Sequence, residues 1–136
     1  MHRTWLAAAA ILGALGVMLG AFGAHGLEKL TTDLSILKTY DTAARYQLVH
    51  AVVLVGVSIL AIHYPSGLIK WSAIFFIAGI IFFSGSLYLI SYLKIREVNA
   101  KMLGPVTPVG GMLLILGWIF LLFAALRRNG NVKVEG

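Results

Sequence analysis

Two histidines, His25 and His50, are the residues of this sequence whose chemistry would say most about function, because each adjoins or lies within a long apolar stretch. Imidazoles on neighbouring helices can ligate a haem or another metal ion, or can pass protons through a membrane. The alternative is that both rings are neutral and hydrogen-bonded, and fix the register of the helices that carry them. No carboxylate stands near them at the spacing of a metal site, so we favour the structural role and predict neither a cofactor nor a metal.

Other polar side chains also occur inside the apolar stretches, where lipid would leave them without hydrogen-bond partners. Tyr46 and His50 are one helical turn apart and share a face, whereas Arg45 is close enough to a span end to extend toward the membrane surface. A catalytic serine needs a general base, and no histidine accompanies Ser84 in the sequence, so we predict no catalytic residue. We expect one buried polar cluster, whose predicted members are His25, Arg45, Tyr46, Gln47, His50, Ser84, Ser86, Tyr88 and Thr107. The candidate partners of the His50 ring are His25, Ser84, Ser86 and Thr107.

These side chains must be positioned by four apolar stretches, residues 4–24, 42–63, 71–93 and 106–126. Hydrophobic residues make up 60% of the 136-residue chain and charged residues 12%, against about 45–50% and about 25% in soluble domains. Each stretch has the roughly 20 residues that a helix needs to cross a bilayer. The composition therefore predicts a single integral membrane domain, residues 1–136, folded as an all-α four-helix bundle.

The first two stretches each allow another interpretation. The first exceeds the apolar region of about 7–15 residues in a signal peptide, and further spans follow it, so we interpret it as a span rather than a cleaved leader. In the second, strictly apolar residues cover only 51–62, and a spanning length requires an extension back to Thr42. We accept that extension because the other three stretches already place the chain in lipid.

The segment between these two stretches, residues 27–40, has leucines at every third or fourth position and polar residues between them. This spacing puts the leucines on one face of a helix and the polar residues on the other. The pattern predicts a short amphipathic interfacial helix between spans one and two.

Glycines recur every three or four residues along the first stretch, from Gly13 to Gly26. A helix face without side chains lets a neighbouring helix approach closely and strengthens the contacts between them. A passage for a substrate along this face is the alternative, but small residues are the ordinary means of helix association in membranes, so we favour packing. Together with glycines of the later stretches, the predicted packing positions are Gly16, Gly20, Gly23, Gly85, Gly110 and Gly111.

The basic residues indicate which partners to expect. The net charge is +6, but the basic residues stand singly between apolar runs rather than in a stripe, so we predict no nucleic-acid partner. The chain contains no cysteine, which excludes disulfides and thiolate sites. Four spans place both termini on one side, where Arg127 and Arg128 adjoin the last span and Lys70 adjoins the third. Basic residues favour the cytoplasmic side, so we predict cytoplasmic termini and a polar tail over residues 127–136.

Four motifs occur in order along the chain: Gly20 to Leu27 (GAFGAHGL), Tyr46-Gln47 with His50, Phe83 to Tyr88 (FSGSLY), and Thr107-Pro108 with Gly110-Gly111 and Gly117-Trp118. Over about residues 5–126 the sequence resembles the YgdD/YwdK-like family of small, uncharacterised bacterial membrane proteins. The resemblance implies a multi-pass protein of the bacterial inner (plasma) membrane. It implies no particular activity, substrate or catalytic residue.

Three functions are compatible with these features. The favoured hypothesis is a non-enzymatic accessory or assembly bundle, whose partners are membrane lipid and either copies of itself or other membrane proteins. The first alternative is a small transporter or channel, which would be oligomeric because four short helices enclose little space. The second alternative is a protein that binds a lipid, a quinone or a haem.

Overall fold

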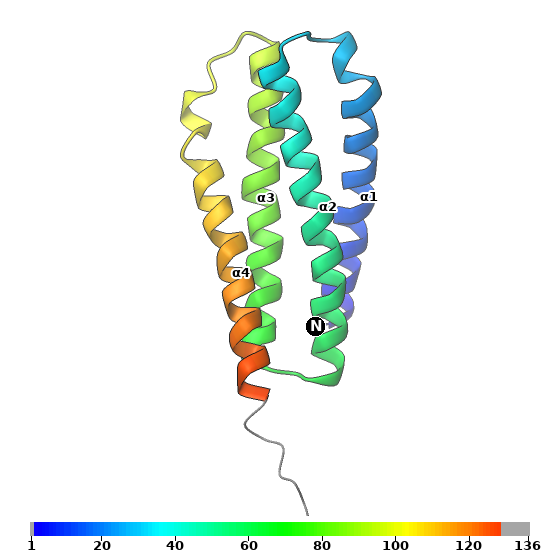
Figure 1. Cartoon of the computed structure of the whole chain (residues 1–136), viewed down its shortest axis with the longest axis vertical. Coiled ribbons are helices and arrows are strands. Elements are labelled where there is room, and N and C mark those ends of the chain that lie inside the picture. Colours follow the sequence, from blue (N-terminus) through cyan, green and yellow to red (C-terminus); the bar gives the residue numbers. More distant parts are fainter. Residues whose placement is uncertain (1, 129–136) are drawn as a thin grey trace, which may run out of the picture.

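The computed structural model describes residues 2–128, and these form four long helices that run alternately up and down (Figure 1). The helices are α1 (His2–His25), α2 (Leu34–His63), α3 (Gly67–Ile95) and α4 (Val106–Arg128). Each contains a segment long and apolar enough to cross a membrane. The prediction of an all-α membrane bundle with four spans is confirmed. Residues 129–136 of the predicted polar tail lie outside the described residues.

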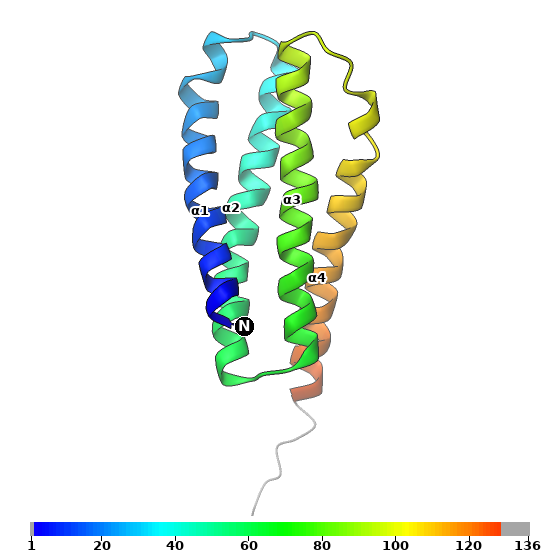
Figure 2. The same ribbon diagram turned by 180° about the vertical axis from the view of Figure 1, so that it is seen from behind.

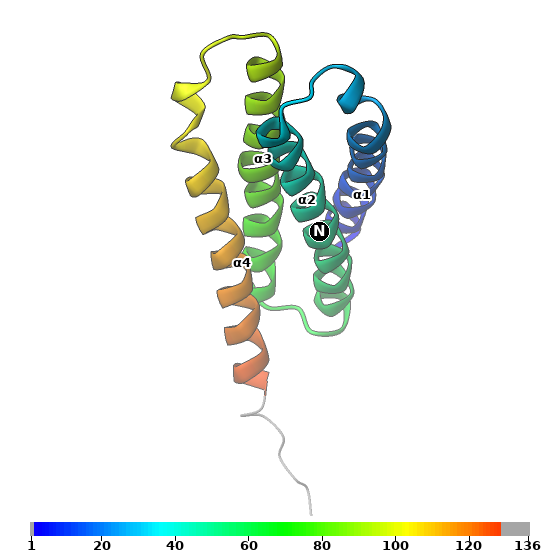
Figure 3. The same cartoon turned by 45° about the horizontal axis from the view of Figure 1, so that its top comes forward.

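The helices form a row in chain order, with α2 and α3 at its centre. The extensive contacts are those of α1 with α2, of α2 with α3 and of α3 with α4. The view from behind and the tilted view both place α1 and α4 at opposite ends of the row (Figure 2; Figure 3). Consequently α1 is the most exposed helix: only 11% of the residues in its most apolar window are buried, against 39% for α2.

The predicted interfacial helix is present only as one short turn. The 3-10 helix η1 covers Leu27–Lys29, and α2 begins at Leu34, so the second half of the predicted segment belongs to a spanning helix. Asp33 caps α2 by accepting a hydrogen bond of 2.8 Å from the Ser35 backbone N–H. This bond favours the carboxylate and holds the pKa of Asp33 below its usual value. The leucine spacing predicted one shared apolar face, but Leu27 is buried whereas Leu30 and Leu34 are exposed.

The predicted glycine face of α1 packs against α2. A Cβ atom at Gly16 would lie 2.8 Å from Cδ2 of Leu48, and one at Gly23 would lie 2.7 Å from the Tyr40 ring. Gly20 is less crowded, since its Cβ position lies 3.9 Å from Cβ of Ala44. Side chains of α2 therefore pack closely on this face at Gly16 and Gly23, as predicted for helix packing.

The glycines of the last two helices differ in role. Gly110 of α4 lies against the α3 backbone, with its Cβ position 2.6 Å from Cα of Phe83, and Gly111 makes ordinary contacts of 3.7 Å with the Phe83 ring. Gly85, in contrast, is exposed, and no atom lies within 4 Å of its Cβ position. The prediction that Gly85 packs against another helix of the bundle is therefore wrong for residues 2–128, because Gly85 is on the outer face of α3.

The Gly23→Ala substitution should destabilise the bundle by about 1–3 kcal/mol, the usual range for an overpacked contact. The added methyl group would displace the Tyr40 ring, whose hydroxyl donates a 2.9 Å hydrogen bond to the Leu19 carbonyl of α1. Gly20→Ala is the matched control on the same face and should change stability by less than about 0.5 kcal/mol. Thermal unfolding in detergent measures both, and equal effects would contradict the assigned geometry.

Candidate functional site

A chain of polar side chains crosses the middle of the bundle and centres on Gln47 of α2. Gln47 is only 4% exposed. Its Nε2 donates to the Leu12 carbonyl of α1 at 2.8 Å, and its Oε1 accepts from the Tyr88 hydroxyl of α3 at 2.8 Å. A carbonyl only accepts, so these partners fix which end of the amide faces α1. One side chain therefore connects three helices.

Tyr40 extends this network toward the end of the bundle that carries η1. Its hydroxyl donates to the Leu19 carbonyl, and its ring packs edge-on against Tyr88 with centroids 5.0 Å apart. The sequence interpretation missed Tyr40. It lies seven residues before Gln47, about two helical turns, so its position on the same face of α2 was a usable signal.

His50 is buried between α2 and α4. Its Nδ1 lies 2.8 Å from the Tyr46 carbonyl, and its Nε2 accepts from the Trp118 indole N–H at 3.3 Å. A carbonyl can only accept and an indole N–H can only donate, so the ring is neutral and carries its proton on Nδ1. Both ring nitrogens therefore have hydrogen-bond partners. The aromatic rings of Tyr46 and Phe76 pack on the imidazole at centroid distances of 5.9 and 5.7 Å.

The predicted partners of His50 are wrong. None of His25, Ser84, Ser86 and Thr107 bonds to it; the partner from another helix is Trp118. The error arises because residues of the same helix turn point to different neighbours. Gln47 bonds to α1 and α3, whereas the bond of His50 to another helix comes from α4. Trp118 was noted in the sequence as part of a motif with Gly117 and was not proposed as a partner of His50.

The serines form three separate ties between helices. Ser84 donates to the Ala43 carbonyl of α2 at 2.8 Å. The Ser86 hydroxyl lies 2.9 Å from the Phe83 carbonyl of its own helix and 2.7 Å from the Thr107 hydroxyl of α4. Ser72, which was not predicted, is fully buried and donates to the Gly117 carbonyl of α4 at 2.8 Å. It is the second residue of the third predicted apolar stretch, so a polar side chain inside a span was a usable signal that the prediction overlooked.

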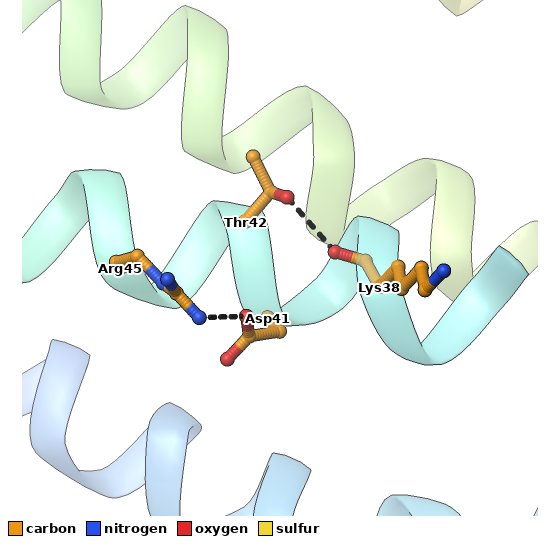
Figure 4. Close-up of polar contacts among 4 residues, drawn as sticks. All are labelled: Lys38, Asp41, Thr42 and Arg45. Carbon is orange, nitrogen blue, oxygen red and sulfur yellow. Dashed lines mark hydrogen bonds and ion pairs between the residues drawn. The ribbon is translucent and has the colours of Figure 1, made fainter. Parts of the chain in front are cut away.

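Three predicted members of the buried cluster are exposed, and the first is Tyr46, which is 43% exposed although its ring stacks on His50. Arg45 pairs with Asp41 one turn earlier rather than with a member of the network, and its side chain is 71% exposed (Figure 4). On the opposite side of the same turn, Thr42 donates to the Lys38 carbonyl at 2.9 Å (Figure 4). His25 is exposed at the last residue of α1. His25 is at a helix end, and Arg45, although eleven residues after the start of α2, has a long side chain that can extend toward the membrane surface.

The network joins helices and leaves no buried polar group unused. Within residues 2–128, every buried side-chain nitrogen and oxygen has a hydrogen-bond partner. In the same part of the chain, no three His, Asp or Glu side chains come together in a way that could hold a metal ion. Chemically, the arrangement can hold α1 and α3 against α2, and α4 against α3 and α2. It contains no carboxylate that could act as an acid or base.

The His50–Trp118 bond should be measurable as a coupling energy. His50→Leu and Trp118→Phe each remove one partner, and the double variant should be more stable than additivity predicts, by about 0.6 and at most about 1.7 kcal/mol. Unfolding in detergent of the four proteins gives this value. His50→Leu combined with Ser86→Ala is the control pair and should be additive, since Ser86 bonds to Thr107 instead. Coupling in the control pair alone would show that the assigned partners are wrong.

Comparison with known proteins agrees with this architecture. Residues 19–111 match a family described as a protein of unknown function (DUF423). A UPF0382 membrane protein of Staphylococcus aureus is 41% identical over 128 residues, which cover 88% of this chain and 96% of the relative. The UPF0382 membrane protein YwdK of Bacillus subtilis is 37% identical, over 92% of this chain and 98% of its own. The UPF0382 inner membrane protein YgdD of Escherichia coli is 36% identical, over 92% and 91%.

No solved structure matches the chain. The resemblance inferred from the four motifs is confirmed, because both proteins that typify that family are among the relatives. The family covers more than half of the chain, and the relatives are aligned over nearly their whole length. The chain therefore belongs to the DUF423 family of UPF0382 membrane proteins, whose function is unknown.

Proposed function

We propose that the chain is a non-enzymatic bundle that assembles with other membrane components through its exposed helix faces. The observation that carries this proposal is that the buried polar groups form hydrogen bonds within the bundle and hold its helices together. Gln47, Ser72 and Ser84 bond only to neighbouring helices, and His50 divides its two bonds between its own helix and α4. A groove of about 280 Å³ between α2 and α4 reaches His50, but neither ring nitrogen is available there to a ligand or a substrate.

Two exposed glycines support assembly through the outer faces. No atom lies within 4 Å of a Cβ position on Gly56 of α2 or Gly85 of α3, and both residues are exposed. Glycine is an unfavourable choice for contact with lipid alone, because it gives up both side-chain contact and helix propensity. On a membrane helix it allows another helix to approach closely. A second copy of the chain or another membrane protein is the partner that such positions suit.

Blue-native electrophoresis of mildly solubilised membranes tests the proposal. The chain at its native expression level should migrate as an assembly larger than a monomer. Gly56→Trp and Gly85→Trp should reduce its size, whereas His50→Leu should leave it unchanged. Met18→Trp is the control, since that residue is also exposed but lies on α1, a helix that carries neither of the two glycines. A monomeric wild-type protein, or folded His50→Leu protein that loses the assembly, would contradict the proposal.

We also propose that both termini are cytoplasmic. Arg3, Lys70 and Arg127 lie at the end of the bundle where α1 begins and α4 ends. The other end carries six basic residues, so the proposal rests on Arg127, which belongs to the last turn of the fourth span. The C-terminal fusion of a reporter that works only in the periplasm should be inactive. An active fusion would reverse the orientation.

A further inference from the structure

An apolar groove of about 460 Å³ lies at the end of the bundle opposite the termini. One wall is formed by the last turns of α1 and by η1, including Leu19 and Leu27. The other is formed by the last turns of α3, including Tyr92 and Ile95, and Tyr40 of α2 lies between the walls. The groove exists because α1 packs chiefly on α2 and leaves space beside the end of α3. Its volume is within the range of about 300–1,000 Å³ that is typical of small-molecule sites.

The polar atoms in this groove are already paired. The Tyr40 hydroxyl donates to the Leu19 carbonyl, the Tyr88 hydroxyl donates to Gln47, and Ser91 donates to the Leu87 carbonyl of its own helix. The interior therefore presents hydrocarbon and aromatic ring surface. A quinone or another ligand with polar groups along its length would find no donor there to orient it. A plain acyl chain needs none.

The groove has one charged residue, Arg96, immediately after the end of α3. Among residues 2–128, Arg96 forms no ion pair, because the single bridge there joins Arg45 to Asp41. Position 96 is just beyond a spanning helix, where the phosphates of a bilayer lie. An apolar groove with an unpaired cation at its end is complementary to an amphiphile with a long apolar tail and an anionic head.

We propose that this groove binds one acyl chain of an anionic phospholipid, whose phosphate pairs with the Arg96 guanidinium. The planar fork of an arginine suits a phosphate, since two of its N–H groups can donate to two phosphate oxygens. This site is independent of the assembly proposed above, which uses the exposed faces around Gly56 and Gly85. The two proposals can therefore fail separately.

Native mass spectrometry of the full chain in detergent tests the site, with phosphatidylglycerol and phosphatidylcholine of equal chain length as probes. The wild type should bind phosphatidylglycerol about fivefold more tightly, as expected for one basic residue at a membrane surface. Arg96→Gln should abolish the preference. Lys101→Gln, which removes an exposed charge at the same end but outside the groove, should keep it.

A second pair of variants tests the apolar walls. Leu30→Trp changes an exposed wall residue, so folding should be unaffected, and it should weaken binding of both lipids by filling the groove. Leu15→Trp changes an exposed leucine of α1 outside the groove and should have no effect. Equal binding of the two lipids by the wild type, or equal losses in Arg96→Gln and Lys101→Gln, would overturn the proposal. Equal losses in the two tryptophan variants would also overturn it, because the lipid would then be bound over the general surface.

Discussion

Replacing Gly110 with alanine is expected to destabilise the protein by about 3 kcal/mol or more, the upper end of the range for overpacked contacts. The new methyl group would lie 2.6 Å from Cα of Phe83 and 2.7 Å from the carbonyl carbon of Phe82, atoms of the α3 backbone. A side chain could rotate away, but a backbone cannot, so α4 would have to separate from α3. That movement would also break the ties of Ser72 to Gly117 and of Ser86 to Thr107.

Gly111→Ala is the matched control for this experiment. It adds the same methyl group to the next residue of the same helix, where the nearest atoms belong to the Phe83 ring at 3.7 and 3.8 Å. Gly85→Ala, on the outer face of α3, is a second control, and both variants should stay within about 0.5 kcal/mol of the wild type. Thermal unfolding in detergent compares the three proteins. Equal stability of the Gly110 and Gly111 variants would mean that α4 does not pack on α3 at this point.

The sequence predicts the spans of this protein well because hydrocarbon thickness constrains them directly. An apolar stretch of about 20 residues has few alternatives, and α3 and α4 extend only a few residues beyond the predicted ranges. The start of α2 was harder to place. The helix continues for eight residues before Thr42, because Asp33 caps it at that point and no proline or glycine interrupts the chain from there to Thr42.

The partners within the bundle could not be predicted, for a physical reason. In a soluble protein the outer face of a helix is polar, so hydrophobic periodicity reveals which face is buried. In a membrane both faces are apolar, since lipid chains are as apolar as leucine. Gly85 and Gly110 consequently look alike in the sequence, although one is exposed and the other touches a backbone. His50 could likewise be recognised as buried, but its partner Trp118 could not be chosen over the serines.

Gln47→Glu is expected to have the other large effect, a loss of about 3 kcal/mol at neutral pH. The carboxylate would still accept from Tyr88, but it has no N–H to donate to the Leu12 carbonyl, and at 4% exposure its charge would be buried. A charged side chain at the centre of a membrane helix costs about 2.5–3.5 kcal/mol by insertion measurements. Gln47→Leu removes the same hydrogen bonds without adding a charge, and should cost only about 1 kcal/mol.

In acid the carboxyl group introduced by Gln47→Glu is protonated and neutral. Its O–H can then donate to the Leu12 carbonyl while its own carbonyl accepts from Tyr88, so the effect of the substitution should depend on pH. The stability of Gln47→Glu should therefore approach that of the wild type in acid and fall as the pH rises, whereas Gln47→Leu should differ from the wild type by the same amount at every pH. Adding Tyr88→Phe to Gln47→Leu should recover part of the loss, since it removes the hydroxyl left without a partner. Unfolding in detergent from pH 4 to pH 8 measures all four proteins. A Gln47→Glu protein as stable as Gln47→Leu at neutral pH would mean that Gln47 is reached by water and does not join the three helices.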